Sequence, residues 1–137
     1  MLWAAVAAFA LALDLSSVKS EPKLEKRSEL ALQYAASALD TAKAAYRDGR
    51  FEQTQAALGE VQDAVSLSYE SLLATGKNPR KSSKPFKDAE KATRELLRRL
   101  TGFRDSMSVV DHPVLEPVMA SVKNVNDMLL VGIMTGQ

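Results

Sequence analysis

Apolar residues recur every three or four positions along four long stretches of this 137-residue chain. Such spacing lines them up on one side of a helix, so each stretch predicts an amphipathic helix with a buried side. We expect the helices at about residues 21–48, 50–75, 84–110 and 112–134. The predicted core positions are Leu32, Ala35, Leu39, Ala42 and Tyr46; Phe51, Thr54, Leu58, Val61, Val65, Ser68 and Leu72; Phe86, Ala89, Thr93, Leu96, Leu100, Phe103, Met107 and Val110; and Leu115, Val118, Val122, Val125 and Leu129.

Glycine, proline and serine mark the predicted ends of these helices. Gly49 and Gly76 follow the first two stretches, where glycine suits a left-handed turn. Ser20 is a candidate cap of the first helix, with Pro22 in its first turn, and Pro85 falls in the first turn of the third. Residues 76–84 form the one long loop.

The lengths of the links predict how the helices are arranged. The first and third links are short, so they join antiparallel hairpins, and the middle loop is long enough to set the hairpins side by side. A heptad spacing favours the shallow helix crossing of bundles and coiled coils. We therefore predict one all-α domain over residues 13–137, an up-down-up-down antiparallel four-helix bundle.

The chain opens with an uninterrupted apolar run from Leu2 to Leu13. Twelve helical residues reach only about 18 Å, too short for a hydrocarbon core about 30 Å thick. The run has the length of a secretory signal, and Ala10-Leu11-Ala12 gives the small-x-small pattern of a cleavage site. The sequence thus predicts a signal peptide over residues 1–12, a periplasmic or secreted protein, and no membrane span after processing. No basic region precedes the run, and the alternative is an N-terminal helix that packs on the bundle.

The composition excludes several kinds of chemistry. Without cysteine there are no disulfides, zinc–thiolate sites, iron–sulfur clusters or thiol catalysis. No phosphate-binding glycine loop or nucleophile elbow occurs. Carboxylates are scattered beside basic residues, as in Glu90 with Arg94 and Glu95 with Arg99. We therefore expect a protein that is not an enzyme and holds no cofactor.

His112 is the only histidine, with Asp111 beside it and Glu116 one turn on. We expect Asp111 or His112 to cap the fourth helix rather than bind a metal. A di-metal bundle site needs two histidines. A haem site resembling that of the four-helix periplasmic cytochromes is not favoured, because the first helix has no methionine and His112 precedes a proline. The remaining methionines are interpreted as core-filling residues rather than copper ligands: Met107, Met119, Met128 and Met134.

Charge is unevenly distributed, although the net charge is only +1. Lys77 to Arg104 contains ten basic and three acidic residues, which leaves the rest of the chain acidic. On the third predicted helix a basic stripe recurs every three or four positions: Lys84, Lys87, Lys91, Arg94 and Arg98. This stripe is either a site for an anionic envelope surface or a solvated face partly neutralised by the acidic second helix. Nucleic acid is not expected, because no aromatic residues interleave with the cations.

The end of the last predicted helix is apolar around most of its circumference. A bundle buries about half of a helix, so some of these side chains are expected to be exposed. Leu130, Ile133 and Met134 are therefore candidate contacts to an unknown protein partner, a second copy in a homodimer included. The alternative is that the loop at 76–84 closes this end of the bundle.

The first predicted turn, with Ala45-Tyr46, Gly49, Phe51-Glu52 and Leu58, resembles the inter-helix turn of a tetratricopeptide repeat. The resemblance covers about residues 38–61 and implies peptide or protein binding in a groove. The family's usual alanine is replaced by Thr54, the helices are longer, and no second copy follows at the family's repeat length. We interpret it as shared hairpin geometry. The sequence as a whole predicts a non-catalytic binding module.

Overall fold

The computed structural model describes residues 15–136, and every regular element in that range is helical. The α-helices are α2 (Leu24–Arg47), α3 (Phe51–Ala74), α4 (Ser83–Ser106) and α5 (Glu116–Thr135). A 3-10 helix, η1 (Val109–Val114), links α4 to α5, and residues 15–19 are helical ahead of α2. The all-helical prediction is confirmed, but this range holds two helical segments beyond the four predicted. The predicted signal peptide, residues 1–12, lies outside the described residues.

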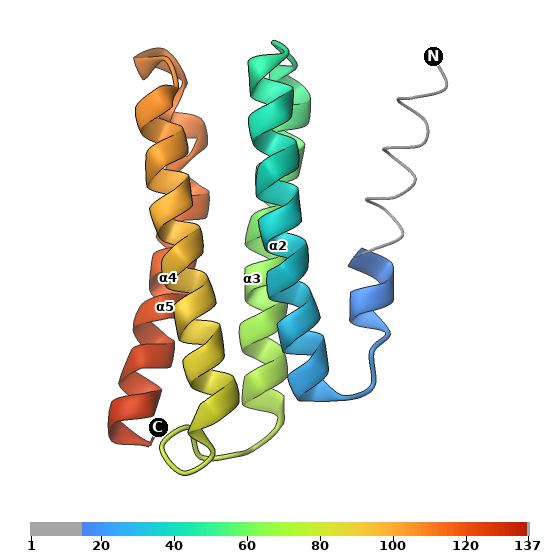
Figure 1. Ribbon diagram of the computed structural model, residues 1–137, viewed down its shortest axis with the longest axis vertical. Coiled ribbons are helices and arrows are strands. Elements are labelled where there is room, and N and C mark those ends of the chain that lie inside the picture. The colour runs from blue at the N-terminus through green and yellow to red at the C-terminus, as the bar shows by residue number, and fades with distance from the viewer. Residues whose placement is uncertain (1–14, 137) are drawn as a thin grey trace.

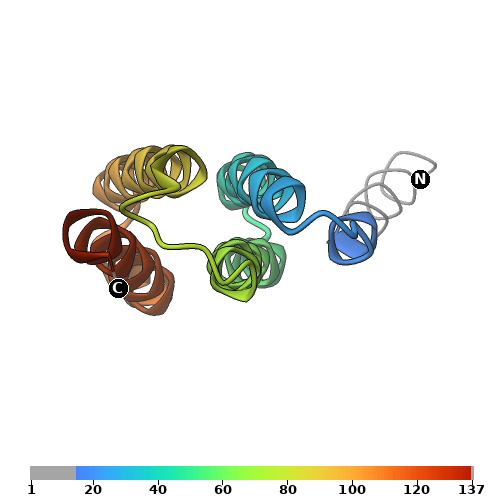
Figure 2. The same cartoon turned by 90° about the horizontal axis from the view of Figure 1, so that it is seen from below.

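The four α-helices form two antiparallel pairs, α2 with α3 and α4 with α5, which stand side by side (Figure 1). Viewed along the helix axes, α2 lies next to α4 and α3 next to α5 (Figure 2). Residues 15–19 lie beside the first pair, on the side away from α4 and α5. Val18 is buried there and Leu15 packs against the core.

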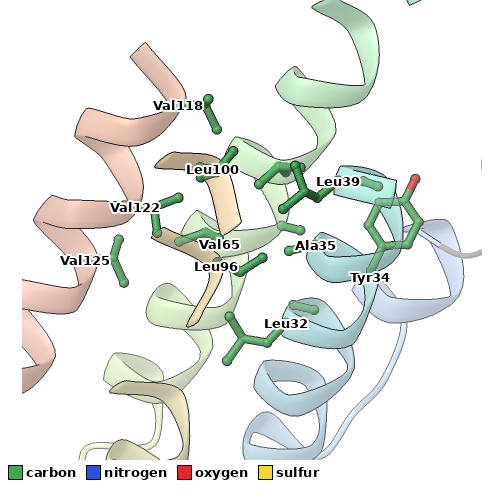
Figure 3. Close-up of a cluster of buried hydrophobic side chains, with 14 of the residues drawn as sticks. Leu32, Tyr34, Ala35, Leu39, Val65, Leu96, Leu100, Val118, Val122 and Val125 are labelled. Carbon is green, nitrogen blue, oxygen red and sulfur yellow. The ribbon is translucent and has the colours of Figure 1, made fainter. Parts of the chain in front are cut away.

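The core fills the space between the helix pairs. Leu39, Val65, Leu100 and Val122 come from α2, α3, α4 and α5, and none has any exposed surface (Figure 3). Each such side chain contributes about 1.5–3 kcal/mol by leaving water. The predicted core positions are all buried except three: half-buried Tyr46, and the exposed Phe51 and Val110. The helical periodicity therefore predicted the buried sides of the helices.

The buried polar groups of the core are hydrogen-bonded. The hydroxyls of Ser28 in α2 and Ser68 in α3 lie 2.7 Å apart and join the two helices. The hydroxyls of Thr54, Ser71 and Thr93 each donate to the carbonyl oxygen four residues earlier. No buried side-chain oxygen or nitrogen in residues 15–136 is without a partner. Burying these groups therefore leaves no uncompensated desolvation cost.

Glycine makes the turns where the sequence predicted them. Gly49 and Gly76 have φ values of +76° and +68°, which side chains disfavour. Gly136 ends α5 at φ +81°, and a Cβ there would lie 3.2 Å from the Asn78 side-chain oxygen. The loop between α3 and α4 thus lies against the end of α5.

The first helix begins later than predicted, at Leu24 rather than residue 21. Ser20 does not cap it, because its hydroxyl donates to the carbonyl of Ser17 at 2.9 Å. Pro22 precedes the helix instead of lying in its first turn. The Glu21 carboxylate accepts from the backbone N–H of Lys23 at 3.2 Å, a local bond that competes with helix formation.

The third predicted helix ends at Ser106, four residues early. Met107 is extended, with ψ 153°, and the chain then enters η1. Val110 is consequently 82% exposed instead of buried. Pro113 lies further along the chain, inside η1, where proline has no backbone N–H to donate to a continuing α-helix. The fourth predicted helix, 112–134, is divided between η1 and α5.

Candidate functional site

The predicted basic stripe lies along the exposed side of α4. Its five members are all exposed: Lys84, Lys87, Lys91, Arg94 and Arg98. Three of them pair with a carboxylate on the same helix: Lys84 with Asp88 at 2.8 Å, Arg94 with Glu90 at 3.1 Å, and Arg98 with Glu95 at 3.0 Å. Lys87 and Lys91 have no acidic partner among residues 15–136. Most of the charge of the stripe is therefore locally compensated.

Exposed ion pairs shift the pKa values of three groups. The hydrogen bond from Arg98 lowers the pKa of Glu95, and that from Lys84 to Asp88 raises the pKa of Lys84. The pKa of Arg98 is raised by the bond to Glu95. All three groups are fully exposed, so each pair stabilises the ionised forms without a buried charge. The expected pairing of Glu95 with Arg99 is wrong, since Arg99 pairs with Asp40 of α2.

Arg94 of the basic stripe takes part in a hydrogen-bond network that links α4 to α5. Asn126 donates from its amide nitrogen to the Glu90 carbonyl at 2.9 Å, the Glu90 carboxylate at 3.0 Å and the Thr93 hydroxyl at 3.0 Å. The same Glu90 carboxylate accepts from Arg94. Glu90 and Arg94 thus have a structural role that the sequence pattern did not reveal.

The C-terminal part of α5 carries an exposed apolar patch. Leu130 is 44%, Val131 55% and Met134 68% exposed. These positions are neighbours on the outer surface of one helix. Ile133, which the sequence grouped with Leu130 and Met134, is instead half-buried against the core. We call Leu130, Val131 and Met134 the α5 patch.

Asp111 and His112 do not cap α5, contrary to the prediction. The N-cap position is Leu115, and no side chain bonds there. Asp111 accepts a 2.8 Å hydrogen bond from the hydroxyl of Tyr46. A ring nitrogen of His112 lies 3.2 Å from the Met107 carbonyl oxygen. Both side chains therefore hold the α4–η1–α5 link in place, and Glu116 is the acidic residue of the first turn of α5.

Two grooves run between α2 and α4, where the two pairs of helices face each other. The lower groove lies between the N-terminal halves of these helices and has a volume of about 530 Å³. Its apolar floor includes Leu32, Ala36, Ala89 and Ala92. The upper groove, about 760 Å³, lies between the C-terminal halves of the same helices. Its charged lining is Asp40, Lys43, Arg47, Arg98 and Arg99. Only Arg98 among these belongs to the basic stripe predicted from the sequence, because local periodicity does not show which residues of α2 and α4 face each other.

The structure offers no metal centre within residues 15–136, since no three histidine or carboxylate side chains cluster there. The methionines are dispersed: Met107 is buried, Met119 half-buried, and Met128 and Met134 exposed. None of the helices in this range is both long enough and apolar enough to cross a membrane. The chain matches no protein-family model, and no curated protein and no solved structure is significantly similar to it.

Proposed function

We propose that this protein is an exported, non-catalytic helical module that binds a protein partner through the α5 patch. The observation that carries the proposal is the exposure of Leu130, Val131 and Met134 on a helix whose opposite side is fully buried. Burial of apolar surface contributes about 25 cal/mol per Å². A partner that covers three such side chains would gain a compact hydrophobic contact of the kind found at interface centres.

The proposed architecture is an up-down-up-down four-helix bundle formed by α2, α3, α4 and α5. Two features support it: the antiparallel pairs, and a core to which all four helices contribute (Figure 3). A rigid bundle keeps the α5 patch in a fixed shape, which lowers the entropic cost of binding. We attribute the local resemblance to a tetratricopeptide repeat to the geometry that tight helical hairpins share.

Export rests on the apolar run Leu2–Leu13 and on Ala10-Leu11-Ala12. A secreted or periplasmic product whose N-terminus follows residue 12 supports cleavage. N-terminal sequencing of the exported protein measures this directly. An intact Met1 on that product would contradict it.

The binding proposal is tested with L130Q/M134Q and a matched control. The α4–α5 link lies at the opposite end of the molecule from the C-terminus (Figure 1). Val109 and Val110 in η1 of that link are 76% and 82% exposed, so V109Q/V110Q removes two exposed apolar side chains elsewhere. The wild-type protein is used to capture partners from an envelope extract, and sedimentation velocity measures self-association. We expect L130Q/M134Q to lose the complex or the dimer and V109Q/V110Q to keep it. A complex that L130Q/M134Q retains would overturn the assignment to the α5 patch.

Binding to an anionic envelope surface through the basic stripe is the second candidate function. The exposed Lys87 and Lys91, without acidic partners among residues 15–136, favour it. It predicts salt-sensitive binding to anionic vesicles. That binding should be lost when Lys87, Lys91, Arg94 and Arg98 are all changed to glutamine. Unchanged binding would end this candidate.

A further inference from the structure

The upper groove brings cationic side chains from two helices into one hollow. Lys43 and Arg47 come from successive turns of α2, and Arg98 and Arg99 come from α4. The groove has a volume of about 760 Å³. Asp40 is the only carboxylate in its lining. Like charges held on facing helices repel each other, so this arrangement gains stability from an added anion.

The ion pairs of the groove leave two of the four cations uncompensated. Arg99, with a side chain only 25% exposed, pairs across the groove with Asp40, and Arg98 pairs with Glu95 on its own helix. Lys43, which is half-buried, and Arg47 pair with no carboxylate within residues 15–136. The groove therefore retains two positive charges, one turn apart on α2.

The α4 side of the groove leaves room for a ligand. Gly102 contributes to the lining, and apart from its two chain neighbours and the nearby backbone of α4, no atom lies within 4 Å of the position where its Cβ would be. The two hydroxyls of the lining are already engaged: that of Tyr46 with Asp111 and Ser108, and that of Ser106 with the carbonyl of Phe103. The free hydrogen-bond donors that face this space therefore come mainly from Lys43 and Arg47.

We propose that the upper groove binds a phosphate monoester, held by Lys43 and Arg47 and bordered by Arg98, Arg99 and Gly102. A phosphate monoester carries a charge of about −1.5 to −2 near neutral pH, which matches the two uncompensated cations. Arginine can bind phosphate through two parallel hydrogen bonds, and lysine adds a point charge. A single carboxylate would compensate only one of the cations. This site is separate from the α5 patch and does not depend on it.

A phosphate monoester can come from a soluble metabolite or from the headgroup of a lipid. Glycerol 3-phosphate is the soluble probe, followed by amide NMR shifts of the full chain at low salt. Vesicles of phosphatidylcholine containing phosphatidic acid, also a monoester, are the lipid probe. Vesicles with the same content of phosphatidylglycerol, a diester with less charge, are the comparison. Binding to one probe rather than the other identifies the source.

The test variant is K43Q/R47Q, and the control is R80Q/K81Q, which removes the same charge, also one lysine and one arginine, from the exposed loop between α3 and α4 outside the groove. We expect saturable shifts centred on the Gly102 amide, or stronger binding to phosphatidic acid than to phosphatidylglycerol. K43Q/R47Q should weaken that binding about ten-fold or more, and R80Q/K81Q about two-fold or less. Circular dichroism checks that both variants remain folded.

The proposal is overturned if neither probe binds, or if the shifts occur away from Gly102. It is also overturned if the two variants weaken binding equally, because the binding would then report general charge. Loss in R80Q/K81Q alone would place the anion at the loop between α3 and α4 and likewise remove the groove site. None of these results bears on partner binding by the α5 patch, which L130Q/M134Q tests separately.

Discussion

The hydroxyl of Tyr46, at the end of α2, donates a 2.8 Å hydrogen bond to the carboxylate of Asp111 in η1. The same hydroxyl accepts a 3.0 Å bond from the backbone N–H of Ser108, and the ring meets Phe103 edge-on with centroids 5.8 Å apart. One side chain of the first hairpin thus holds the link between the two helices of the second hairpin. This contact ties the two helix pairs together at the upper end of the molecule.

Removing this hydroxyl should loosen the link without disturbing the core. Y46F keeps the ring contact with Phe103 but leaves Asp111 and the Ser108 N–H without their partner. We expect a loss of about 1–2 kcal/mol in the free energy of unfolding, measured by urea denaturation. Y69F is the control, because Tyr69 is also half-buried but makes no side-chain hydrogen bond within residues 15–136. Equal effects of Y46F and Y69F would show that the Tyr46 bonds contribute no net stability.

The core should respond strongly to truncation of a fully buried side chain. Leu39 has no exposed surface, so L39A removes buried contacts and leaves a cavity. We expect a loss of about 2–5 kcal/mol. Leu73 is 54% exposed, and L73A should change the stability by less than about 0.5 kcal/mol. Thermal unfolding of both variants checks the difference, and similar losses would contradict the proposed core.

The buried hydroxyl pair between α2 and α3 predicts non-additive effects. S28A leaves the Ser68 hydroxyl buried without its partner, at a cost of about 1–3 kcal/mol. S28A/S68A removes both polar groups and should cost less than the sum of the single changes. A double-mutant cycle of unfolding free energies measures this coupling. Strict additivity would mean that the two hydroxyls do not interact.

Two glycines should respond to alanine with opposite signs. Gly59 lies inside α3 with open space around its Cβ position, so G59A should stabilise the protein by about 0.5–1 kcal/mol. Gly49 also has open space but adopts φ +76°, so G49A should destabilise it by about 1–2 kcal/mol. Chemical denaturation gives both values. A stabilising G49A would show that the turn can relax to a right-handed conformation.

The Glu95–Arg98 pair predicts a small dependence of stability on pH. Folding lowers the pKa of Glu95 through the hydrogen bond from Arg98. The stabilisation is therefore present above the pKa of the unfolded chain and is lost as the pH falls through the lower, folded value. Carboxyl NMR should find Glu95 titrating below its reference value of 4.5 in the wild type. In R98Q its pKa should rise, whereas in K87Q it should stay unchanged.

The sequence predicted the buried side of each helix because the apolar residues that form it recur within one continuous stretch of sequence. Leu39 and Leu100 stand at positions that helical spacing alone assigns to the core. The end of α4 was harder to predict, since Val110 continues the heptad pattern although the chain leaves the α conformation at Met107. Ile133 shows a related limit, because neighbouring apolar positions on one helix differ in burial according to what lies beside them.

The upper groove could not be predicted from local pattern. Lys43 and Arg99 lie on helices from different hairpins, and no periodicity within either helix shows that they face the same hollow. The ion pairs made by the basic residues of α4 were only partly predictable for the same reason. Glu90 with Arg94 is a contact within one helix, whereas Arg99 with Asp40 depends on how the hairpins meet.

The alanine-lined side of α2 restricts how this sequence can vary. Four alanines of this side have no exposed surface: Ala31, Ala35, Ala38 and Ala42. Only glycine, which has no side chain, is smaller than alanine. In a deep mutational scan, these positions should accept little beyond glycine and serine, because larger groups force the packed backbones apart. The exposed Gln33 and Ser37 on the same helix should tolerate most replacements. Divergent homologues would then be recognised by this alanine signature sooner than by their surface residues.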